Sequence, residues 1–378
     1  MKRLNTATLT FHASHNYGSM LQAYALQHFL IKEIGVDNEI INFRSIAQKK
    51  MYSFPKEEKH SWKYNLIKYL LPNTKEDRIK KYNLFESFLS DYLTLSPEYN
   101  EEKDVIKYAD KFDFLITGSD QIWNTKCIDF NWLYYLPFAK SNAIAYAPSM
   151  GPRGINAIAD EHYDTIKDCL HKFKAISVRE EGTAKAIYSI SRNNAETLID
   201  PTLLISKKEW DELSGNEPII KGEYIFIYHP IVNKEFVEIA KNVSSKMGLP
   251  LYVSNRLPLL DELKNKFSLT NKMHYKLDVG PIEFLNLLKN AKYVISGSFH
   301  AVVFSIIFQK PFLAVNGKTD NRMSQLLKAT HLLDYGVDKN NYLAHLKCLE
   351  NIDFTHSIEY LEEEKHKSIS FLKQAFDL

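Results

Sequence analysis

The amino-acid sequence predicts an α/β protein whose two domains face each other across a cleft. Three observations support this prediction. The chain has 378 residues, 45% of them hydrophobic, which is enough for two domains that each bury a core. Short apolar segments alternate with amphipathic segments of helical periodicity, as in the βαβ units of parallel sheets. A turn-forming stretch at residues 214–218 divides this alternation into two series.

The first domain is expected to span residues 1–214. Its predicted strands are residues 4–11, 39–43, 112–117, 142–147, 175–178 and 198–199. Its predicted helices are residues 18–34, 78–90 and 156–173, with a further helix ending near residue 190. Polar loops follow several of these strands, at residues 12–18, 118–124, 148–151 and 179–183. Because parallel strands end at the same edge of a sheet, these loops are predicted to build a site.

The second domain is expected to span residues 215–355. Strands are predicted at residues 224–228, 251–254 and 312–315, with another beginning at Tyr293, and helices at residues 235–246 and 284–288, with others beginning at His300 and Asn321. The last segment, residues 356–378, contains a charged amphipathic helix at residues 358–376. This helix is expected to pack back on the first domain.

The stretch from Tyr293 to Pro311 carries the clearest sign of chemistry. It is predicted to be a buried strand, a turn of small residues and an apolar helix that starts at His300. A helix N-terminus attracts anions through its free N–H groups and its macrodipole. Ser298 can cap the helix or donate its hydroxyl, and an imidazole can exchange protons near neutral pH. The pattern predicts an anion site beside a proton-handling group, although His300 can also be a structural residue bonded to a carbonyl.

Composition excludes several classes of protein. A formal net charge of +2 gives no bulk electrostatic case for binding nucleic acid. No apolar run approaches the roughly 20 residues of a membrane span. The three cysteines are far apart, which suits a reducing cytoplasm and offers no metal framework, so we expect a cytoplasmic protein with no metal site.

Residues 44–81 differ in composition from the rest of the chain. They contain eleven Lys and Arg against four Asp and Glu, together with several aromatic residues. One interpretation is a solvated helical insertion in the first domain. The other is a peripheral contact with the inner face of a membrane or with a lipid-linked substrate.

Seven segments together resemble the polysaccharide pyruvyl transferase family. They are residues 16–26, 118–124, 146–151, 177–181, 200–204, 280–284 and the stretch that starts at Tyr293, in that order. The resemblance covers the chain from the first strand to about Leu327. It implies two Rossmann-like domains in the arrangement called GT-B. It also implies transfer of a pyruvyl group from phosphoenolpyruvate onto sugar hydroxyls as a ketal, during assembly of surface polysaccharides and without a further cofactor.

The resemblance also implies roles on the donor side. Arg179 and His300 match the residues that hold the donor, Arg179 through its planar fork and His300 as the group that transfers a proton. Ser298 and Phe299 complete the cradle, and His229 is a further candidate contact. Where similar proteins carry Arg-Leu-His, this chain has Ser298-Phe299-His300, so a guanidinium is missing. Lys318 or Arg322 from a neighbouring loop is expected to restore the charge.

The acceptor saccharide is assigned to loops of the first domain. Asp120 is expected to accept hydroxyl protons and Trp123 to stack on a sugar ring. The other acceptor candidates are Asn16, Tyr17, Gly18, Gln121 and Asn124.

Alternatives remain open for these residues and for the function. Arg179 can instead pair with a neighbouring glutamate, and Asp120 can cap a helix. The competing functions are a GT-B glycosyltransferase that uses a nucleotide sugar and a non-catalytic saccharide-binding protein. The sequence does not indicate an oligomeric state.

Overall fold

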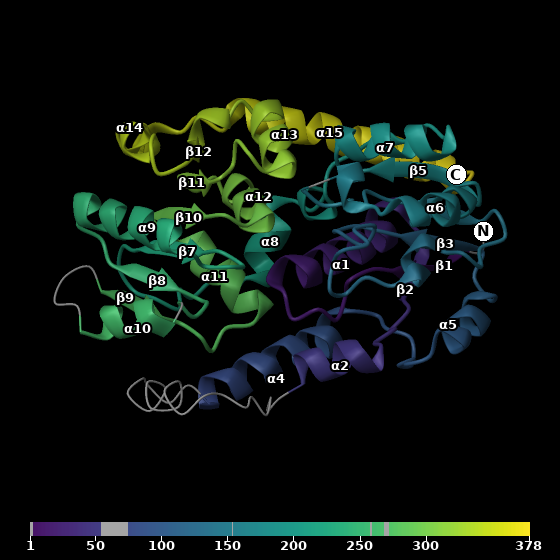
Figure 1. Cartoon of the computed structure of the whole chain (residues 1–378), viewed down its shortest axis with the longest axis horizontal. Coiled ribbons are helices and arrows are strands. Elements are labelled where there is room, and N and C mark those ends of the chain that lie inside the picture. The colour runs from purple at the N-terminus through teal and green to yellow at the C-terminus, as the bar shows by residue number, and fades with distance from the viewer. Residues whose placement is uncertain (1–2, 54–74, 153, 258, 268–271) are drawn as a thin grey trace. The chain divides into compact units, whose positions relative to one another are not determined.

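The structure is a computed structural model of the whole chain that describes residues 3–53, 75–152, 154–257, 259–267 and 272–378 (Figure 1). These residues form two compact units. The first comprises Met1–Tyr52, Leu89–Ile205 and Ile358–Leu378, and the second comprises Ser53–Phe88 and Ser206–Ser357. Each unit is an α/β domain with its own sheet and its own hydrophobic core, as the sequence predicts.

The first unit is built on a six-stranded parallel sheet in the order β2-β1-β3-β4-β5-β6. The strands are β1 (Asn5–Leu9), β2 (Asp37–Ile40), β3 (Phe114–Thr117), β4 (Ala143–Ala145), β5 (Phe173–Val178) and β6 (Glu196–Thr197). The helices are α1 (Tyr17–Phe29), α2 (Ile46–Tyr52), α5 (Glu102–Ala109), α6 (Tyr163–Leu170) and α7 (Glu181–Ser191). The central strands β3 and β4 are almost wholly buried, as expected of a parallel sheet covered by helices.

The second unit repeats this plan with a parallel sheet in the order β12-β11-β10-β7-β8-β9. The strands are β7 (Ile225–Tyr228), β8 (Leu251–Val253), β9 (Met273–Tyr275), β10 (Tyr293–Ser296), β11 (Phe312–Val315) and β12 (Gly336–Val337). The helices are α8 (Lys207–Leu213), α9 (Lys234–Met247), α10 (Leu259–Lys266), α11 (Pro281–Asn290), α12 (Phe299–Ile307), α13 (Asn321–Ala329) and α14 (Tyr342–His345). Two further helices, α4 (Lys75–Tyr92) and α15 (Thr355–Ala375), include residues of both units.

Each sheet has one point at which the strand order reverses. In the first unit this switch point lies between β1 and β3, and in the second it lies between β7 and β10. Ligands of open α/β sheets bind at the carboxyl ends of the strands beside such a point. The loops after these four strands are therefore the places to look for a site.

The C-terminal helix packs on the first unit, as predicted. Residues 358–378 belong to that unit. The ring of Phe376 meets that of Phe114 edge-on, with centroids 5.3 Å apart, and Lys174 forms an ion pair with Asp377.

The second unit begins at Ser206, earlier than the residue 215 expected from the turn-forming stretch. Ser206 starts α8 through a capping box with Glu209. Trp210 of α8 packs edge-on against Phe304 of α12, with ring centroids 5.0 Å apart. Because α8 buries its one tryptophan there, it belongs with the second unit.

The described residues 75–81 of the basic insertion also belong to the second unit. There Lys80 of α4 forms an ion pair with Asp278 at 2.7 Å. Residues 54–74 lie outside the described residues, so the proposed membrane contact of residues 44–81 stays a prediction.

Several elements differ from the predicted ones, and three of them are described here. The helix expected at residues 156–173 is α6 alone, preceded by short 3-10 turns. The strand expected at residues 198–199 lies two residues earlier, as β6 (Glu196–Thr197). Just after it, the N–H of Leu198 donates to the carbonyl of Val178 at 2.9 Å. Helix α12 begins at Phe299, one residue before the predicted His300.

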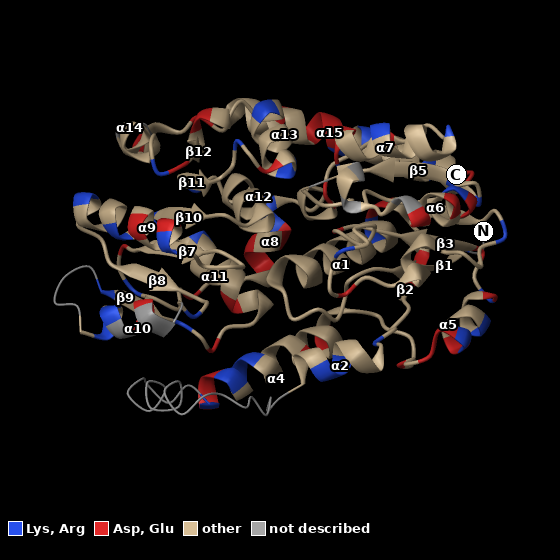
Figure 2. Ribbon diagram, viewed as in Figure 1, with Lys and Arg blue, Asp and Glu red and all other residues tan. Residues whose placement is uncertain are grey.

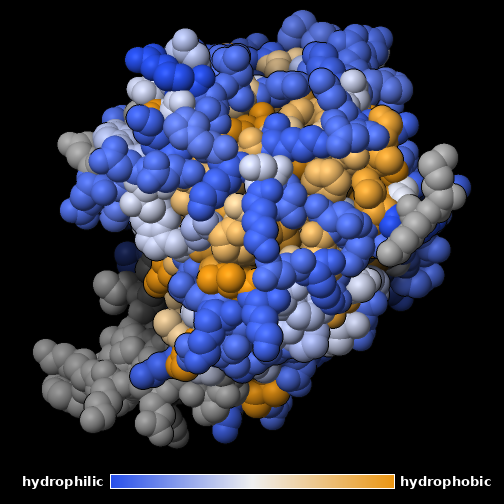
Figure 3. Space-filling view, turned by 90° about the vertical axis from the view of Figure 1, so that its right-hand side faces the viewer, coloured by the Kyte–Doolittle hydropathy of each residue, from blue (hydrophilic) through white to orange (hydrophobic). Residues whose placement is uncertain are grey.

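The surface carries charges of both signs. Figure 2 shows Lys and Arg interspersed with Asp and Glu along the helices of both units. The face in Figure 3 is largely polar, with apolar residues showing in several areas. Within the described part of the chain, no helix is both long and apolar enough to cross a membrane.

Candidate active site

The loops after β7 and β10 meet at the switch point of the second unit. A Cβ atom on Gly297, which follows β10, would lie 2.3 Å from Cδ2 and 2.4 Å from Nε2 of His229, which follows β7. Only glycine therefore lets the imidazole lie this close to the backbone. Nδ1 of His229 accepts the N–H of Ile231 at 3.1 Å, and burial lowers the pKa of His229. The ring is thus held neutral, with its proton on Nε2 beside Gly297.

Helix α12 starts at this point with the three residues that the sequence singled out. Ser298 is the N-cap residue, but its hydroxyl makes no capping hydrogen bond. The side chains of Ser298, Phe299 and His300 are buried, with 8%, 6% and 8% of the residue surface exposed. All nine residues of α12 are buried and no acidic residue stands in its first turn. Apolar packing fixes this helix, and its positive N-terminal end remains uncompensated by an acid in that turn.

A guanidinium lies beside this helix start. Arg322 belongs to α13, and its Cζ lies 5.9 Å from the centroid of the Phe299 ring. Asp320, the N-cap of α13, holds the fork through Nε at 3.1 Å and Nη2 at 2.6 Å. Burial raises the pKa of Asp320, but the hydrogen bonds and charge of Arg322 outweigh it, so the pKa is lowered. Arg322 is therefore a pre-oriented cation beside Phe299, and its role in restoring the charge missing at Ser298 stays a prediction, as does that of Lys318, which is exposed in the preceding loop.

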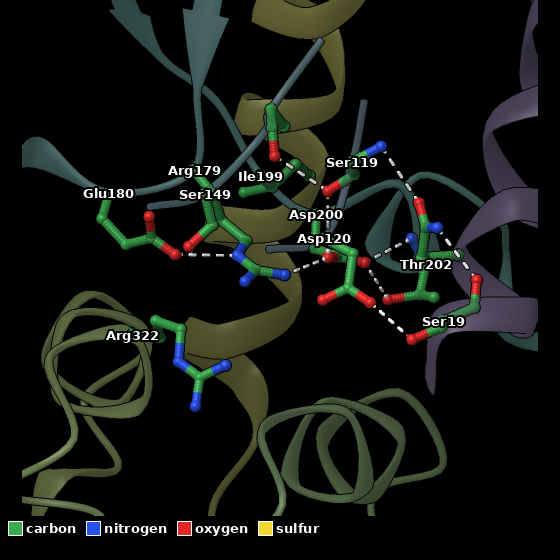
Figure 4. A network of polar contacts seen from close by, with 12 residues as sticks. Ser19, Ser119, Asp120, Ser149, Arg179, Glu180, Ile199, Asp200, Thr202 and Arg322 are labelled. Carbon is green, nitrogen blue, oxygen red and sulfur yellow. Dashed lines mark hydrogen bonds and ion pairs between the residues drawn. The ribbon is translucent and has the colours of Figure 1, made fainter. Parts of the chain in front are cut away.

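The loops after β1 and β3 meet at the switch point of the first unit. Asn16 caps α1, with its Oδ1 accepting the N–H of Gly18 at 2.9 Å. The carboxylate of Asp120 accepts the hydroxyl of Ser19 of α1 at 2.6 Å, so it joins the two loops (Figure 4). Gln22 of α1 strengthens the junction by accepting the N–H of Ser119 at 3.1 Å.

Arg179 lies in a buried ion network of the first unit (Figure 4). Its side chain is 4% exposed, and it donates from Nε to Glu180 and from Nη1 to Asp200, both at 2.8 Å. Asp200 also accepts the hydroxyl of Thr202 at 2.7 Å. Burial lowers the pKa of Arg179, but the charges of Glu180 and Asp200 outweigh it, so the pKa is raised. The interpretation in which Arg179 pairs with its neighbouring glutamate is correct, and its role toward the donor stays a prediction.

Trp123 does not have the place that we predicted. Its side chain is fully buried, and its ring stacks on Tyr135 with centroids 5.0 Å apart and an interplanar angle of 7°. Its Nε1 donates to the carbonyl of Tyr134 at 3.0 Å. Because both the ring face and the polar edge are occupied, Trp123 is a core residue and not a stacking platform for a sugar.

The other acceptor candidates differ in exposure. Tyr17 is buried, with 2% of its surface exposed. Asn124 is half-buried and donates to Oε1 of Gln121 at 3.2 Å. Both amides lie against Gly151, where a Cβ would come within 2.6 Å of Gln121 and 2.7 Å of Asn124. The pair Gln121 and Asn124 thus remains available at the rim of this edge.

Sequence reasoning missed Asp129, which joins the same two loops. Its Oδ2 accepts the hydroxyl of Ser14 at 2.7 Å and that of Tyr52, at the end of α2, at 2.6 Å. The ring of His15 stacks on Tyr52, with centroids 5.2 Å apart. Burial raises the pKa of Asp129 more than the two hydrogen bonds lower it. Asp129 lies outside the segments that resemble the family, so no motif identified it.

The two edges differ in charge. The edge of the first unit carries the carboxylates Asp120 and Asp129, while that of the second carries His229, His300 and Arg322, the last paired with Asp320. Carboxylates suit hydroxyl groups, and imidazoles with a guanidinium suit carboxylate or phosphate. Among the described residues, no group of three or more His, Cys, Asp and Glu is placed to hold a metal ion.

The fold is similar to that of several solved structures. The structure of S. aureus MnaA with UDP matches with a TM-score of 0.58 at 12% identity, covering 100% of this chain and 98% of that one. A UDP-N-acetylglucosamine 2-epimerase from Rickettsia bellii matches with a TM-score of 0.53 at 13% identity, covering 100% and 98%. An alpha-glucosyltransferase in complex with UDP and DNA matches with a TM-score of 0.51 at 10% identity, covering 98% and 94%. These likenesses confirm the predicted GT-B-like, two-domain α/β class.

The family follows from the sequence comparison. The model of the family described as polysaccharide pyruvyl transferase matches residues 16–319, and the chain belongs to that family. A comparison with curated protein sequences gave no match.

Proposed function

We propose that this protein moves the enolpyruvyl group of phosphoenolpyruvate onto two hydroxyls of a saccharide, forming a ketal and releasing phosphate. One observation carries the proposal beyond family membership: imidazoles and a guanidinium gather at the second switch point, around the N-terminus of α12. Phosphoenolpyruvate carries a carboxylate and a phosphate, and both need positive partners. The imidazoles and the guanidinium of this edge therefore support a donor role.

On the donor side, each candidate residue has a distinct task. The N–H groups at the start of α12 and the hydroxyl of Ser298 cradle phosphate. Arg322 supplies the charge that Ser298 lacks. His229, neutral with its proton on Nε2, donates a hydrogen bond to an anionic oxygen. His300 delivers a proton to the methylene carbon of the donor.

The atoms of the reaction balance without a redox partner. A proton adds to the methylene carbon, and the first sugar oxygen bonds to the neighbouring carbon as its own proton leaves. The bond between that carbon and the phosphate oxygen then breaks. The second sugar hydroxyl closes the ring, and its proton leaves with the phosphate. The carboxylate edge of the first unit, with Asp120 and the rim amides Gln121 and Asn124, supports the acceptor side of this scheme.

The first experiment is to incubate the full chain with phosphoenolpyruvate and a panel of hexoses, hexosamines and lipid-linked oligosaccharides. Release of inorganic phosphate is measured together with an acid-labile gain in acceptor mass. Phosphate release that depends on both the donor and a saccharide supports the proposal.

The structural neighbours favour one competitor, because the S. aureus and alpha-glucosyltransferase structures contain UDP. The same panel is therefore run with UDP-sugars. Consumption of a UDP-sugar without any response to phosphoenolpyruvate would replace the proposal by a glycosyltransferase. Binding of a saccharide with turnover of neither donor would indicate a non-catalytic saccharide-binding protein.

A further inference from the structure

Only one of the two carboxylate oxygens of Asp129 accepts hydrogen bonds from the described residues of the protein. Its Oδ2 accepts two hydroxyl donors, Ser14 at 2.7 Å and Tyr52 at 2.6 Å. Its Oδ1 is buried and has no hydrogen-bond partner within the described part of the chain. A buried carboxylate oxygen without a donor is costly, so Oδ1 calls for a donor from outside the chain, which a water or the hydroxyl of a ligand can supply.

The position of Asp129 agrees with this interpretation. Ser14 lies in the loop after β1 and Asp129 in the loop after β3, so their hydrogen bond spans the switch point of the first unit. Asp129 is half-buried, and the adjacent Ile128 is 81% exposed. Asp129 therefore lies in a partly exposed loop at the edge where ligands of such sheets bind, and a ligand that reaches its buried Oδ1 must come in beside Ile128.

The hydrogen-bonding needs of Oδ1 indicate which kind of ligand can bind there. If Asp129 is ionised, Oδ1 needs a donor, and if it is protonated there, Oδ1 needs an acceptor. A hydroxyl group is both, so it satisfies the oxygen before and after a proton moves. A saccharide hydroxyl fits this requirement, whereas a phosphate or carboxylate would meet repulsion from Asp129 and from nearby Asp120.

We propose that Asp129 binds the attacking hydroxyl of the acceptor saccharide and takes its proton, an assignment that rests on the proposed function. As the sugar oxygen bonds to the donor carbon, its proton moves to Oδ1. The neutral carboxyl group then returns this proton to solvent. Ser14 and Tyr52 are positioning residues, because they hold Oδ2 and thereby aim Oδ1.

Several titratable groups surround Asp129. Burial has the largest effect and raises the pKa of Asp129, and the charge of Asp120 raises it further. The hydrogen bonds of Tyr52 and Ser14 and the charge of His15 lower the pKa. Burial also raises the pKa of the neighbouring Cys127 thiol to about 11, so it is uncharged near neutral pH. Loss of the Tyr52 hydroxyl would therefore raise the pKa of Asp129.

The test compares Asp129→Asn with the wild-type chain, using phosphoenolpyruvate and the acceptor found in the panel. The amide keeps an oxygen for Ser14 and Tyr52 but cannot take a proton. We expect kcat to fall by about 10²- to 10⁴-fold, the usual contribution of a general base. The KM for phosphoenolpyruvate and the unfolding midpoint should stay unchanged. Asp110→Asn is the matched control, because Asp110 is a surface carboxylate, 61% exposed and paired with Lys140.

Each other outcome is decisive. An Asp129→Asn variant with wild-type kcat would overturn this assignment and leave the proposed function standing. If Asp129→Asn does not fold, Tyr52→Phe decides: the acid limb of its kcat/KM profile should move to higher pH, and an unmoved limb would overturn the assignment. A wild-type chain that releases no phosphate from phosphoenolpyruvate with any acceptor would remove the proposed function and this inference together.

Discussion

The two switch points share one backbone plan and carry different charged side chains. In the first unit, the charged side chains near the edge are largely committed to one another: Arg179 bridges Glu180 and Asp200 in the core. In the second unit, the edge carries His229, His300 and Arg322, with Asp320 as the acid that holds the guanidinium. The arginine of the first unit is thus enclosed by two carboxylates, whereas the arginine of the second unit lies beside a helix start.

This difference predicts that the charged residue of a motif is not the one that meets the substrate here. Burying a cation is costly unless carboxylates pair with it, and Arg179 has two such partners. Arg322 is 13% exposed and retains a place beside Phe299 of α12. The comparison therefore predicts that mutations at the two arginines will separate stability from donor affinity.

The largest effect is expected at His300, because it alone is assigned a proton transfer at the donor. His300→Asn should lower kcat by about 10²- to 10⁴-fold while the protein stays folded. Initial rates of phosphate release and a thermal unfolding curve provide the measurement. The control is His274→Asn, since His274 is an exposed histidine of the same unit that stacks on Tyr252. Equal activities of the two variants would make His300 a structural residue at a helix start.

Arg179 should show the opposite pattern, with stability lost first. Arg179→Met leaves Glu180 and Asp200 buried without their cation, which is expected to cost about 3–5 kcal/mol of unfolding free energy. Urea unfolding measures this loss, and Arg192→Met, at an exposed arginine of the same unit, should cost almost nothing. If Arg179→Met unfolds like the wild type but binds phosphoenolpyruvate poorly, Arg179 is a donor anchor after all, and the contrast between the units fails.

The sequence predicted the order of strands and helices well, because apolar periodicity is local. It predicted the loops after β1, β3, β4 and β5 as functional, together with the turn after β10 and the contact His229, because polar residues directly follow apolar strands there. It was wrong at Trp123, whose ring face is covered by Tyr135, a contact that periodicity does not specify. It missed Asp129 because the partners Ser14 and Asp129 are 115 residues apart and only the sheet order brings them together.

The next effect concerns the cation of the second unit. Arg322→Ala should weaken binding of phosphoenolpyruvate by about tenfold or more, since a hydrogen bond to a charged group contributes about 1.5–3 kcal/mol. Calorimetric titration with phosphoenolpyruvate measures the change. Lys292→Ala is the control, because Lys292 is a surface cation of the same unit paired with Glu223. If the double variant Ser298→Arg with Arg322→Ala regains the affinity for phosphoenolpyruvate, Arg322 replaces the missing guanidinium. If Arg322→Ala alone leaves the affinity unchanged, the positive charge at the donor comes from Lys318 instead.

The smallest effect tests whether the two loops of the second unit work as one site. A Cβ on Gly297 would press on the imidazole of His229 at 2.3 Å, so Gly297→Ala should push that ring away from the edge. Overpacking of this kind usually costs about 1–3 kcal/mol of folding stability. Here the imidazole ring can move and relieve the strain. We therefore expect the affinity for phosphoenolpyruvate to fall by about tenfold or less. Gly182→Ala is the control, because a Cβ there meets no neighbour within 4 Å. If the ring is the only link, Gly297→Ala should add nothing in a His229→Ala background, since coupled residues are not additive. Full additivity of the two substitutions would mean that Gly297 and His229 act separately, and that the second switch point is not a single donor site.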